Sequence, residues 1–558
     1  MLDKKHVVDV PEEAIVKKDR TVLWTIEKRY IKSKQYNHDV RRMIGKTIDD
    51  NSRRMYPNDN FIELFPDAYN AVLGKKPIPS SQCIGYYALV KAIVNQLPLY
   101  SLLYEVFGKE DTDMILDYAM YQIIYESDVS QHFESSMADK ALFSEKLRSD
   151  SYLSDYFRDH ITEDQTDLFR EKWCEEIIRY KKLRGVYLNV DGSNVDCEAE
   201  GVTLAELGND KSHEKTSIVN MMYVVAPDGT PVTYYQYRGS TIDQKAVRYM
   251  ILYLSHVNVK ILGFCVDRGF CSKPNTDMLR ANGIEFVMMM TSKPDGFADA
   301  RNKLRDLVKF NMEKWIEGTE LFGDTTTVKM FKNDSVETYL HMYFDSERCG
   351  SATTKLLRRI NNVKKAALNA IRNGKVPNIP NDLQEYIDLR KGRGPRTLEM
   401  RKDHIQETIN DMGFHGIATS KEMTALQAHD IYMARDSSEK QYMFMKSKLG
   451  MDKYRTASDE SICGKQFVAF IAGIIRNEIR IGSEKLIQAT ERPDVYSVPA
   501  IIKEVGKTKI KRLPGNVYSL VNDRKVNNIT MLNQFGVTDS VLNELAVIQG
   551  RRLKRVIK

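Results

Sequence analysis

The sequence is poor in cysteine, and its few cysteines form no recognisable pattern. Only seven occur among 558 residues, they are scattered, and no two are spaced as Cys-x-x-Cys. Disulfide-rich scaffolds and structural zinc sites both need closely grouped cysteines. The pattern therefore argues against a disulfide framework and against a structural zinc site. It favours a reducing compartment, which we take to be the cytoplasm.

Long apolar runs are also missing. The longest clean run, Phe467–Ile475, has nine residues, which is about half of what a membrane-spanning helix needs. The first six residues lack the apolar core of a secretion signal. We therefore expect no membrane partner. Hydrophobic residues make up 42% and charged residues 28% of the chain, a composition typical of globular domains.

A large excess of charge of one sign is absent as well, but the charge is unevenly divided. Lysine and arginine number 83 and the acids 76, so the net charge is +7. Residues 101–170 hold sixteen acidic and six basic side chains, whereas residues 500–558 hold four acidic and twelve basic ones. The stretch Ser351–Lys375 has seven basic side chains and no acidic one. An unbroken basic helix favours phosphate contact over a merely solvated face. The DNA-binding residues that we predict there are Lys355, Arg358, Arg359, Lys364 and Lys365.

The length predicts two to four domains. Alternating apolar and polar residues around Val22 indicate a small N-terminal β-rich region at 1–80. Apolar residues at three- and four-residue spacing indicate a helical region at 81–180, a candidate for binding DNA ends. The remaining expected parts are an α/β domain divided between 181–293 and 428–490, an insertion with the basic helix at 294–427, and a basic C-terminal region at 491–558.

The α/β domain shows a recognisable order of elements. Two β-rich runs joined by Pro227-Asp-Gly-Thr-Pro231 predict a hairpin, and the alternation of helix and strand that follows predicts a mixed α/β sheet. This is also the strand order of a ribonuclease-H-like domain, which is the fold class we predict, with a β-containing insertion. The expected strands are Val186–Val190, Ser217–Ala226, Val232–Tyr237, Lys260–Val266 and Ile284–Met290, and the expected helices are Ile242–Val257 and Asn275–Ala281.

Two acidic residues follow strands of this domain, and a third lies on a later helix. Asp191 and Asp267 each end a predicted strand, and sites in open α/β sheets lie at such carboxyl ends. In the predicted helix Ala428–Lys448, four polar residues fall within an arc of roughly 60°. An aromatic ring, a guanidinium, a carboxylate and an amine on one face suit a place where a metal and phosphates meet. These four residues are Tyr432, Arg435, Glu439 and Lys446.

Three carboxylates supply the hard oxygen ligands that Mg²⁺ prefers. Two such ions about 3.5–4 Å apart can activate the attacking oxygen and stabilise the leaving one in phosphoryl transfer. We therefore predict Asp191, Asp267 and Glu439 as catalytic ligands of two Mg²⁺ ions, with Mn²⁺ as a substitute. Asp436 on the same helix is an alternative third ligand, and Glu439 with its basic neighbours could instead form a solvated face.

The late helix carries a motif that resembles a known family. Tyr432-x2-Arg435-x3-Glu439-x6-Lys446 resembles the Tyr-Arg-Glu-Lys signature of a large group of bacterial insertion-sequence DDE transposases, the "IS four" superfamily. Val190–Ser193 and Val266–Ser272 resemble the group's first and second catalytic blocks. The 172 positions from Asp267 to Glu439 match a β-rich insertion that the group carries. Ser240 is a departure, because the group often has asparagine there.

The resemblance implies a cut-and-paste DNA transposase. Metal-activated water would nick the transposon end, and the freed 3′-OH would attack the opposite strand or the target DNA. Tyr432, Arg435 and Lys446 would contact the DNA backbone. The implied partners are double-stranded DNA, as transposon ends and as target, and a second copy of the chain in a synaptic homodimer at the bacterial nucleoid. Two alternatives stay open: a hydrolytic nuclease on the same fold, and a catalytically silent DNA-binding protein derived from a transposase.

Overall fold

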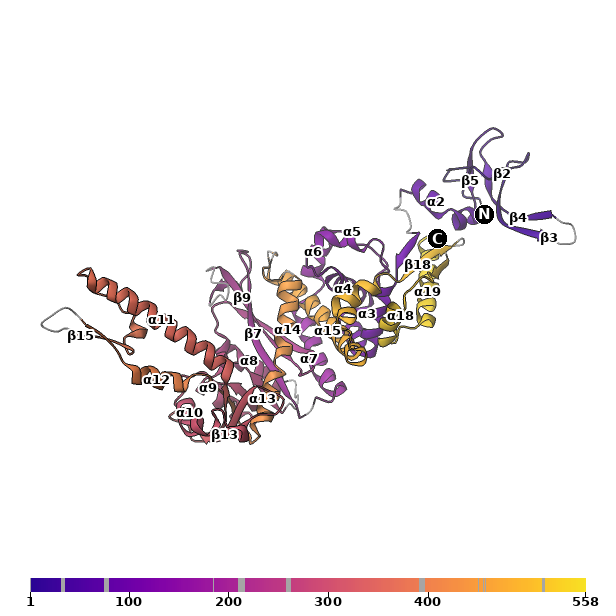
Figure 1. The fold of residues 1–558 in the computed structure, drawn as a ribbon. Helices are drawn as coiled ribbons and strands as arrows, with labels where there is room; N and C mark the ends of the chain where they lie inside the picture. The colour runs from indigo at the N-terminus through magenta and orange to yellow at the C-terminus, as the bar shows by residue number, and fades with distance from the viewer. Residues whose placement is uncertain are drawn as a thin grey trace. The chain divides into compact units, whose positions relative to one another are not determined.

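The computed structural model divides the chain into two compact units (Figure 1). One unit consists of Met1–Phe169 together with Glu460–Lys558, and the other is Arg170–Asp459. None of the described helices is long and apolar enough to cross a membrane. The described residues are 2–31, 36–74, 80–183, 185–208, 216–256, 262–390, 397–449, 451–454, 456, 458–513 and 517–557.

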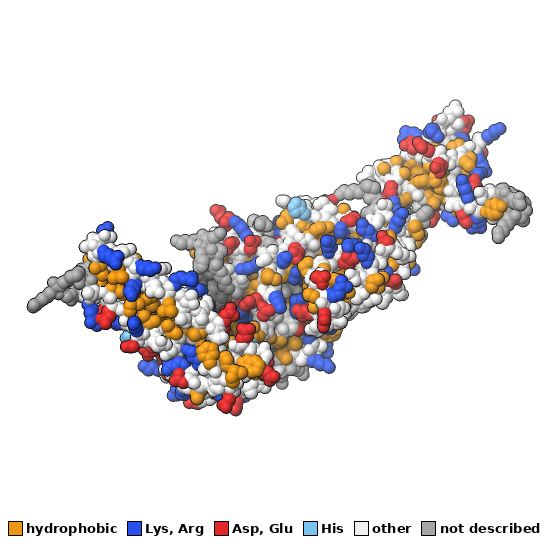
Figure 2. Space-filling model, viewed as in Figure 1, with side chains coloured by type: hydrophobic (Ala, Val, Ile, Leu, Met, Phe, Trp, Pro, Cys, Tyr) orange, Lys and Arg blue, Asp and Glu red, His pale blue; other side chains and the backbone are white. Residues whose placement is uncertain are grey.

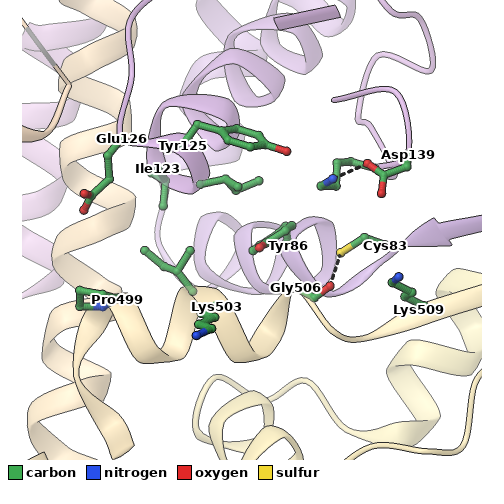
Figure 3. Close-up of a pocket in the computed structure, with 13 residues that line it drawn as sticks. Cys83, Tyr86, Ile123, Tyr125, Glu126, Asp139, Pro499, Lys503, Gly506 and Lys509 are labelled. Carbon is green, nitrogen blue, oxygen red and sulfur yellow. Dashed lines mark hydrogen bonds and ion pairs between the residues drawn. The ribbon is translucent and has the colours of Figure 1, made fainter. Parts of the chain in front are cut away.

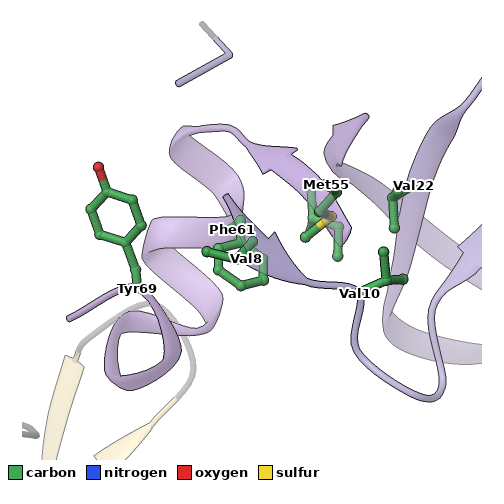
Figure 4. Packing of buried hydrophobic residues seen from close by; sticks show 7 residues of the cluster. Val8, Val10, Val22, Met55, Phe61 and Tyr69 are labelled. Atoms are coloured by element: carbon green, nitrogen blue, oxygen red, sulfur yellow. The ribbon is translucent and has the colours of Figure 1, made fainter. Parts of the chain in front are cut away.

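The N-terminal residues form a small antiparallel sheet, as the alternating pattern predicts. Two short helices, α1 (Asp59–Leu64) and α2 (Pro66–Val72), follow the sheet and contribute Phe61 and Tyr69 to its core. Figure 4 shows these two side chains with Val8, Val10, Val22 and Met55. The strand order is β1 (Val8–Asp9), β5 (Arg54–Pro57), β4 (Tyr36–Thr47), β3 (Thr21–Ile31) and β2 (Ile15–Val16).

The rest of this unit is mainly helical, and its longest apolar run lies in the core. Phe467 on α15 packs against Phe107, with ring centroids 5.0 Å apart, and against Phe169 at 5.2 Å. A short sheet joins β6 (Ser81–Cys83) to β18 (Lys509–Leu513) and β19 (Val517–Leu520). The helices are α3 (Gly85–Gln96), α4 (Leu99–Tyr125), α5 (Phe133–Met137), α6 (Asp150–Asp159), α7 (Glu163–Tyr180, which contains the boundary at Phe169), α15 (Asp459–Thr490), α16 (Pro493–Tyr496), α17 (Val498–Val505), α18 (Val526–Gln534) and α19 (Asp539–Ile557).

A buried carboxyl group on α4 makes the stability of this unit depend on pH. Asp117 is fully buried, and it accepts hydrogen bonds from the backbone amides of Phe143 at 2.7 Å and Ser144 at 2.9 Å. Burial raises the pKa of Asp117 to about 7, although these two bonds favour the charged form. An unfolded chain has an aspartate pKa near 3.9. Between about pH 4 and pH 7 the folded protein therefore holds a proton that the unfolded chain has lost, and stability falls as pH rises.

We expect Asp117→Asn to flatten this pH dependence. Between pH 5 and pH 7 the parent chain should lose about 2 kcal/mol of unfolding free energy relative to the variant. Urea denaturation of both proteins across this pH range, followed by helical circular dichroism, measures the two slopes. Equal slopes would show that Asp117 is already ionised at pH 5.

The second unit is built on one mixed sheet (Figure 1), so the predicted mixed α/β organisation is confirmed. If its first five long strands are numbered 1 to 5 along the chain, their order across the sheet is 3-2-1-4-5. The first three are antiparallel neighbours, and β11 and β12 run parallel to β7. The crossovers are α8 (Asp243–His256) and α9 (Lys273–Ala281). The five strands are β7 (Tyr187–Asp196), β9 (Ser217–Val225), β10 (Pro231–Arg238), β11 (Gly263–Val266) and β12 (Glu285–Met289), and β8 (Glu206–Leu207) pairs with β9.

Strands from the predicted insertion extend the same sheet beyond β12. β17 (Phe414–Thr419) pairs antiparallel with β12, and β14 (Thr338–Asp345) pairs antiparallel with β17. β13 (Leu321–Val328) pairs antiparallel with β14 and completes the sheet. α10 (Asp295–Val308) leads from β12 toward β13.

The basic helix is α11 (Ser346–Arg372), and a small core of its own holds it in place. Ile360 of α11 is buried with Leu383, Tyr386 and Ile405. α11 therefore has an apolar face that packs and an opposite face that stays exposed. The partners in this core belong to β15 (Ile387–Arg390), β16 (Thr397–Met400), α12 (Lys402–Asp411) and the segment before β15.

Candidate active site

Asp191 and Asp267 lie next to each other at the sheet. The parallel pairing of β7 with β11 places Val190 opposite Val266. Asp191 and Asp267 are the next residues along these two neighbouring strands, so they lie at the same level. Asp267 follows the last residue of β11, as predicted, but Asp191 lies inside β7, which continues to Asp196 by pairing with β9, so the prediction that Asp191 ends its strand is wrong. The sheet itself thus brings together two carboxylates that are far apart in the sequence.

The segment with the third carboxylate is interrupted, and the prediction of one continuous helix over 428–448 is wrong. α13 (Ala425–Met433) ends before Ala434, α14 (Asp436–Met443) begins after Arg435, and a π-helical turn spans Phe444–Lys448. The Ala434 carbonyl accepts hydrogen bonds from the Asn189 amide at 3.0 Å and the Ser437 hydroxyl at 2.8 Å. A side chain that donates to a helix carbonyl competes with the backbone hydrogen bond that this carbonyl would accept and can interrupt the helix. Arg435 therefore stands at a junction beside β7.

Arg435 is the centre of the site. Its Nη1 lies 3.3 Å from Asp191 Oδ2, and its Nη2 contacts Glu439 Oε1. The guanidinium also lies over the Tyr432 ring, 5.4 Å from the ring centroid. The Tyr432 hydroxyl donates a hydrogen bond to Asp267 Oδ1 at 3.1 Å. Five of the predicted site residues therefore belong to one network.

Burial gives this network its electrostatic character. The side chains of Arg435 and Asp191 are only 12% and 17% exposed, whereas Glu439 is 56% exposed and opens the network to solvent. Burial raises the pKa of Tyr432, so its hydroxyl is a neutral donor. Burial also opposes the charge of Arg435, but the acidic groups around it raise the pKa of this guanidinium. The site thus contains one fixed positive charge among three carboxylates.

Two further residues of the helix have other neighbours. Lys446 lies in the π-helical turn with its amine 3.4 Å from Asn194 Oδ1, on β7. Asp436, the alternative third ligand, forms an ion pair with Lys440 at 2.9 Å. Glu439, and not Asp436, therefore shares Arg435 with Asp191.

Five of the predicted DNA-binding residues lie on α11 and differ in their surroundings. Lys355, Arg358 and Lys365 are exposed on the side of the helix opposite Ile360. Figure 2 shows basic side chains along this helix. Arg359 donates a hydrogen bond to Asp382 at 3.1 Å, and Lys364 is half-buried at the flank.

The strand directions place the start of α11 at the same end of the sheet as the carboxylates. β14 is antiparallel to β17, which is antiparallel to β12, so β14 runs in the same direction as β7 and β11. Its last residue, Asp345, caps α11 by accepting a hydrogen bond from the Arg348 amide at 2.8 Å. The basic helix therefore starts at the carboxyl-end edge of the sheet.

The donor set fits a magnesium site in its chemistry. Three carboxylates are the oxygen ligands that Mg²⁺ prefers, and Arg435 shows that a cation can lie between Asp191 and Glu439. In the described part of the chain, no three acidic, histidine or cysteine side chains converge closely enough to hold one metal ion. Arg435 and Tyr432 engage oxygens of all three carboxylates in this structure.

Tyr442 is a site residue that the sequence analysis missed. Its buried hydroxyl donates a hydrogen bond to the Asp191 carbonyl at 2.7 Å and accepts one from the Tyr223 amide at 3.0 Å. Tyr442 therefore fixes α14 to both β7 and β9, one helical turn after Glu439. An aromatic residue on an amphipathic helix is typical of a core position, and its sequence neighbours carry no sign of this role.

We expect Tyr442→Phe to lower the free energy of unfolding by about 1–3 kcal/mol, because two buried backbone groups lose their partner. Tyr249→Phe is the matched control, since Tyr249 is 55% exposed and such surface changes stay within about 0.5 kcal/mol. Urea denaturation of both variants and the parent measures the difference. Equal stability of the two variants would remove Tyr442 from this role.

A separate cavity of about 520 Å³ lies in the other unit (Figure 3). Its wall includes Cys83, Tyr86 and Lys503, and it contains none of the predicted site residues. The Cys83 thiol donates a hydrogen bond to the Gly506 carbonyl at 3.2 Å, and burial raises its pKa. A thiol with a raised pKa is a poor nucleophile.

Comparison with known proteins adds little to this geometry. No protein-family model and no curated protein matches the chain. Among solved structures, the chain is similar to a cryo-EM structure of the piggyBac transposase synaptic complex with hairpin DNA, at 9% identity and a TM-score of 0.35. The match covers 85% of this chain and 83% of that one.

Proposed function

We propose that this protein is a metal-dependent DNA transposase of the DDE type, which cleaves DNA at transposon ends and joins the freed end to target DNA. The observation that carries the proposal is the network in which Asp191, Asp267 and Glu439 are linked through Arg435 and Tyr432. The strand order 3-2-1-4-5 supports a ribonuclease-H-like catalytic domain. The Tyr-Arg-Glu-Lys motif supports membership of the "IS four" superfamily.

In the proposed mechanism the three carboxylates would hold two Mg²⁺ ions, or Mn²⁺ in their place. The ions supply activation of the attacking oxygen and stabilisation of the leaving oxygen. Arg435 and Lys446 would donate hydrogen bonds to phosphate oxygens. Tyr432 would orient Asp267 through its hydroxyl. The nucleophile would be water and then a DNA 3′-OH, so no side chain needs to form a bond to DNA.

Double-stranded DNA is the proposed partner. The exposed basic face of α11 supports it, because this helix starts at the edge of the sheet where the carboxylates lie. A phosphate backbone that follows this face could pass from the helix to the carboxylates. Cutting two ends together calls for a synaptic homodimer, and we propose action at the bacterial nucleoid.

The test is a cleavage and joining reaction. The protein is incubated with Mg²⁺ and the DNA that flanks its gene, including any inverted repeats, and the products are resolved by strand. Strand-specific nicks followed by joined products are expected. Cleavage without joining would identify a hydrolytic nuclease, and DNA binding without cleavage would identify a catalytically silent DNA-binding protein.

A further inference from the structure

The site contains a cation of its own. The Arg435 guanidinium lies where the carboxylates of Asp191 and Glu439 both reach it. We propose that, in the protein without DNA, Arg435 pairs with the carboxylates of Asp191 and Glu439 and so keeps metal ions from binding there. A DNA phosphate that binds Arg435 releases these carboxylates. This inference rests on the proposed function and names a regulation of the same site.

Arg435 and a metal ion would compete for the same carboxylate oxygens. A metal ion held by Asp191 and Glu439 would need carboxylate oxygens that now face Arg435. Charge-assisted bonds of this kind are about twice as strong as neutral ones. Asp191 is also largely sheltered from water, which weakens the screening of its attraction to Arg435. Metal binding must therefore overcome this internal ion pairing.

Arg435 has hydrogen-bonding capacity left over. Its Nε is buried and has no hydrogen-bond partner among the described residues. A buried donor without a partner is unfavourable, because it has lost its hydrogen bonds to water. A guanidinium presents five donors in a fork that matches phosphate oxygens in pairs. A DNA phosphate can thus accept hydrogen bonds from Arg435 donors, including Nε, that the two carboxylates leave without a partner.

Glu439 is more than half exposed, so the network opens to solvent on the side of α14. Arg435 lies at the junction between α13 and α14, where its backbone is still helical, and its side chain is 12% exposed. The proposal requires this side chain to rotate toward a phosphate on the open side. Asp191 and Glu439 would then be free to bind metal.

The consequence is a reciprocal coupling between DNA and metal. If DNA raises the affinity for metal, metal must raise the affinity for DNA by the same factor. We expect a factor of about ten, within the usual range for such coupling. Metal would then bind mainly to protein that already has DNA bound, and cleavage would be limited to bound DNA.

The experiment measures Mn²⁺ binding to the full-length protein by electron paramagnetic resonance, with and without a short duplex, and with the duplex alone as the blank. In the parent protein, DNA should tighten Mn²⁺ binding about tenfold. Arg435→Gln should bind Mn²⁺ about tenfold more tightly without DNA and show no further gain with it. Arg435→Lys, which keeps the charge, guards against a folding defect and should lie between the two.

A matched control comes from the same helix. Lys440→Gln removes a cation that pairs with Asp436 outside the network, and both Mn²⁺ affinities should match the parent values. Equal Mn²⁺ affinity in the parent with and without DNA, or no tightening in Arg435→Gln, overturns the inference. Asp191→Asn, measured with the duplex present, separates this result from the proposed function. If that variant then binds Mn²⁺ as the parent does, Asp191 is not a metal ligand and the proposed function itself fails.

Discussion

Asp191→Asn is expected to lower Mg²⁺-dependent DNA cleavage by more than about a hundredfold, while the protein still binds DNA. Replacing a residue that merely supports a metal ligand costs about 10–100-fold, so loss of a proposed ligand should cost more. Asparagine keeps the shape of the side chain and can still accept the hydrogen bond that Asp191 receives from the Gly192 amide at 2.9 Å. The change therefore removes a negative charge with little effect on local structure.

The measurement combines a nicking assay with a gel-shift assay on the same DNA. Asp267→Asn and Glu439→Gln should behave like Asp191→Asn. Asp436→Asn is the matched control on the same helix, because its carboxylate pairs with Lys440 and not with Arg435, and it should cleave normally. An inactive Asp436→Asn together with an active Glu439→Gln would make Asp436 the third ligand. Full activity of Asp191→Asn would remove this residue from the proposed triad.

The second large effect is expected from the basic face of α11. Replacing four of the exposed bases of α11 with glutamine should weaken DNA binding by at least about a hundredfold at moderate salt. Each lost phosphate contact should also lower the slope of log affinity against log salt by about 0.9. The apolar face of α11 around Ile360 is untouched, so the helix should keep its place. The four positions are Lys355, Arg358, Lys365 and Arg372.

Arg359 provides the control on the same helix. Its guanidinium already pairs with Asp382, so Arg359→Gln should reduce the affinity less than replacement of Arg358. Fluorescence anisotropy at several salt concentrations measures both affinity and slope. Unchanged affinity and slope in the fourfold variant would place α11 outside the DNA contact surface.

Much of the local structure could be predicted because its signals are local. The β-rich runs before Asp191 and Asp267 and the Pro-Asp-Gly turn belong to short segments of sequence. The mixed α/β organisation follows from the order of such segments, and it is confirmed. The acid-free stretch that forms α11 was recognisable for the same reason, because charge and helical spacing are both read within one segment.

The helix of the third carboxylate shows where local signals stop. Its four polar residues predicted one continuous face, but Asn189 on β7 takes the Ala434 carbonyl and α13 ends there. The sequence around Tyr442 gives no sign of its hydrogen bonds to β7 and β9. Both features depend on a strand more than 200 residues away in the chain.

The sequence by itself determined which residue types are present, their spacing within each element, and the order of strands and helices. Only the tertiary structure decided that Arg435 pairs with Asp191 and Glu439 and that Asp436 pairs with Lys440. It also decided that α11 starts at the same end of the sheet as the carboxylates. The physical reason is that periodicity and propensity act over a few residues. Pairing between side chains depends on strand register and helix packing, which bring distant segments of the chain together.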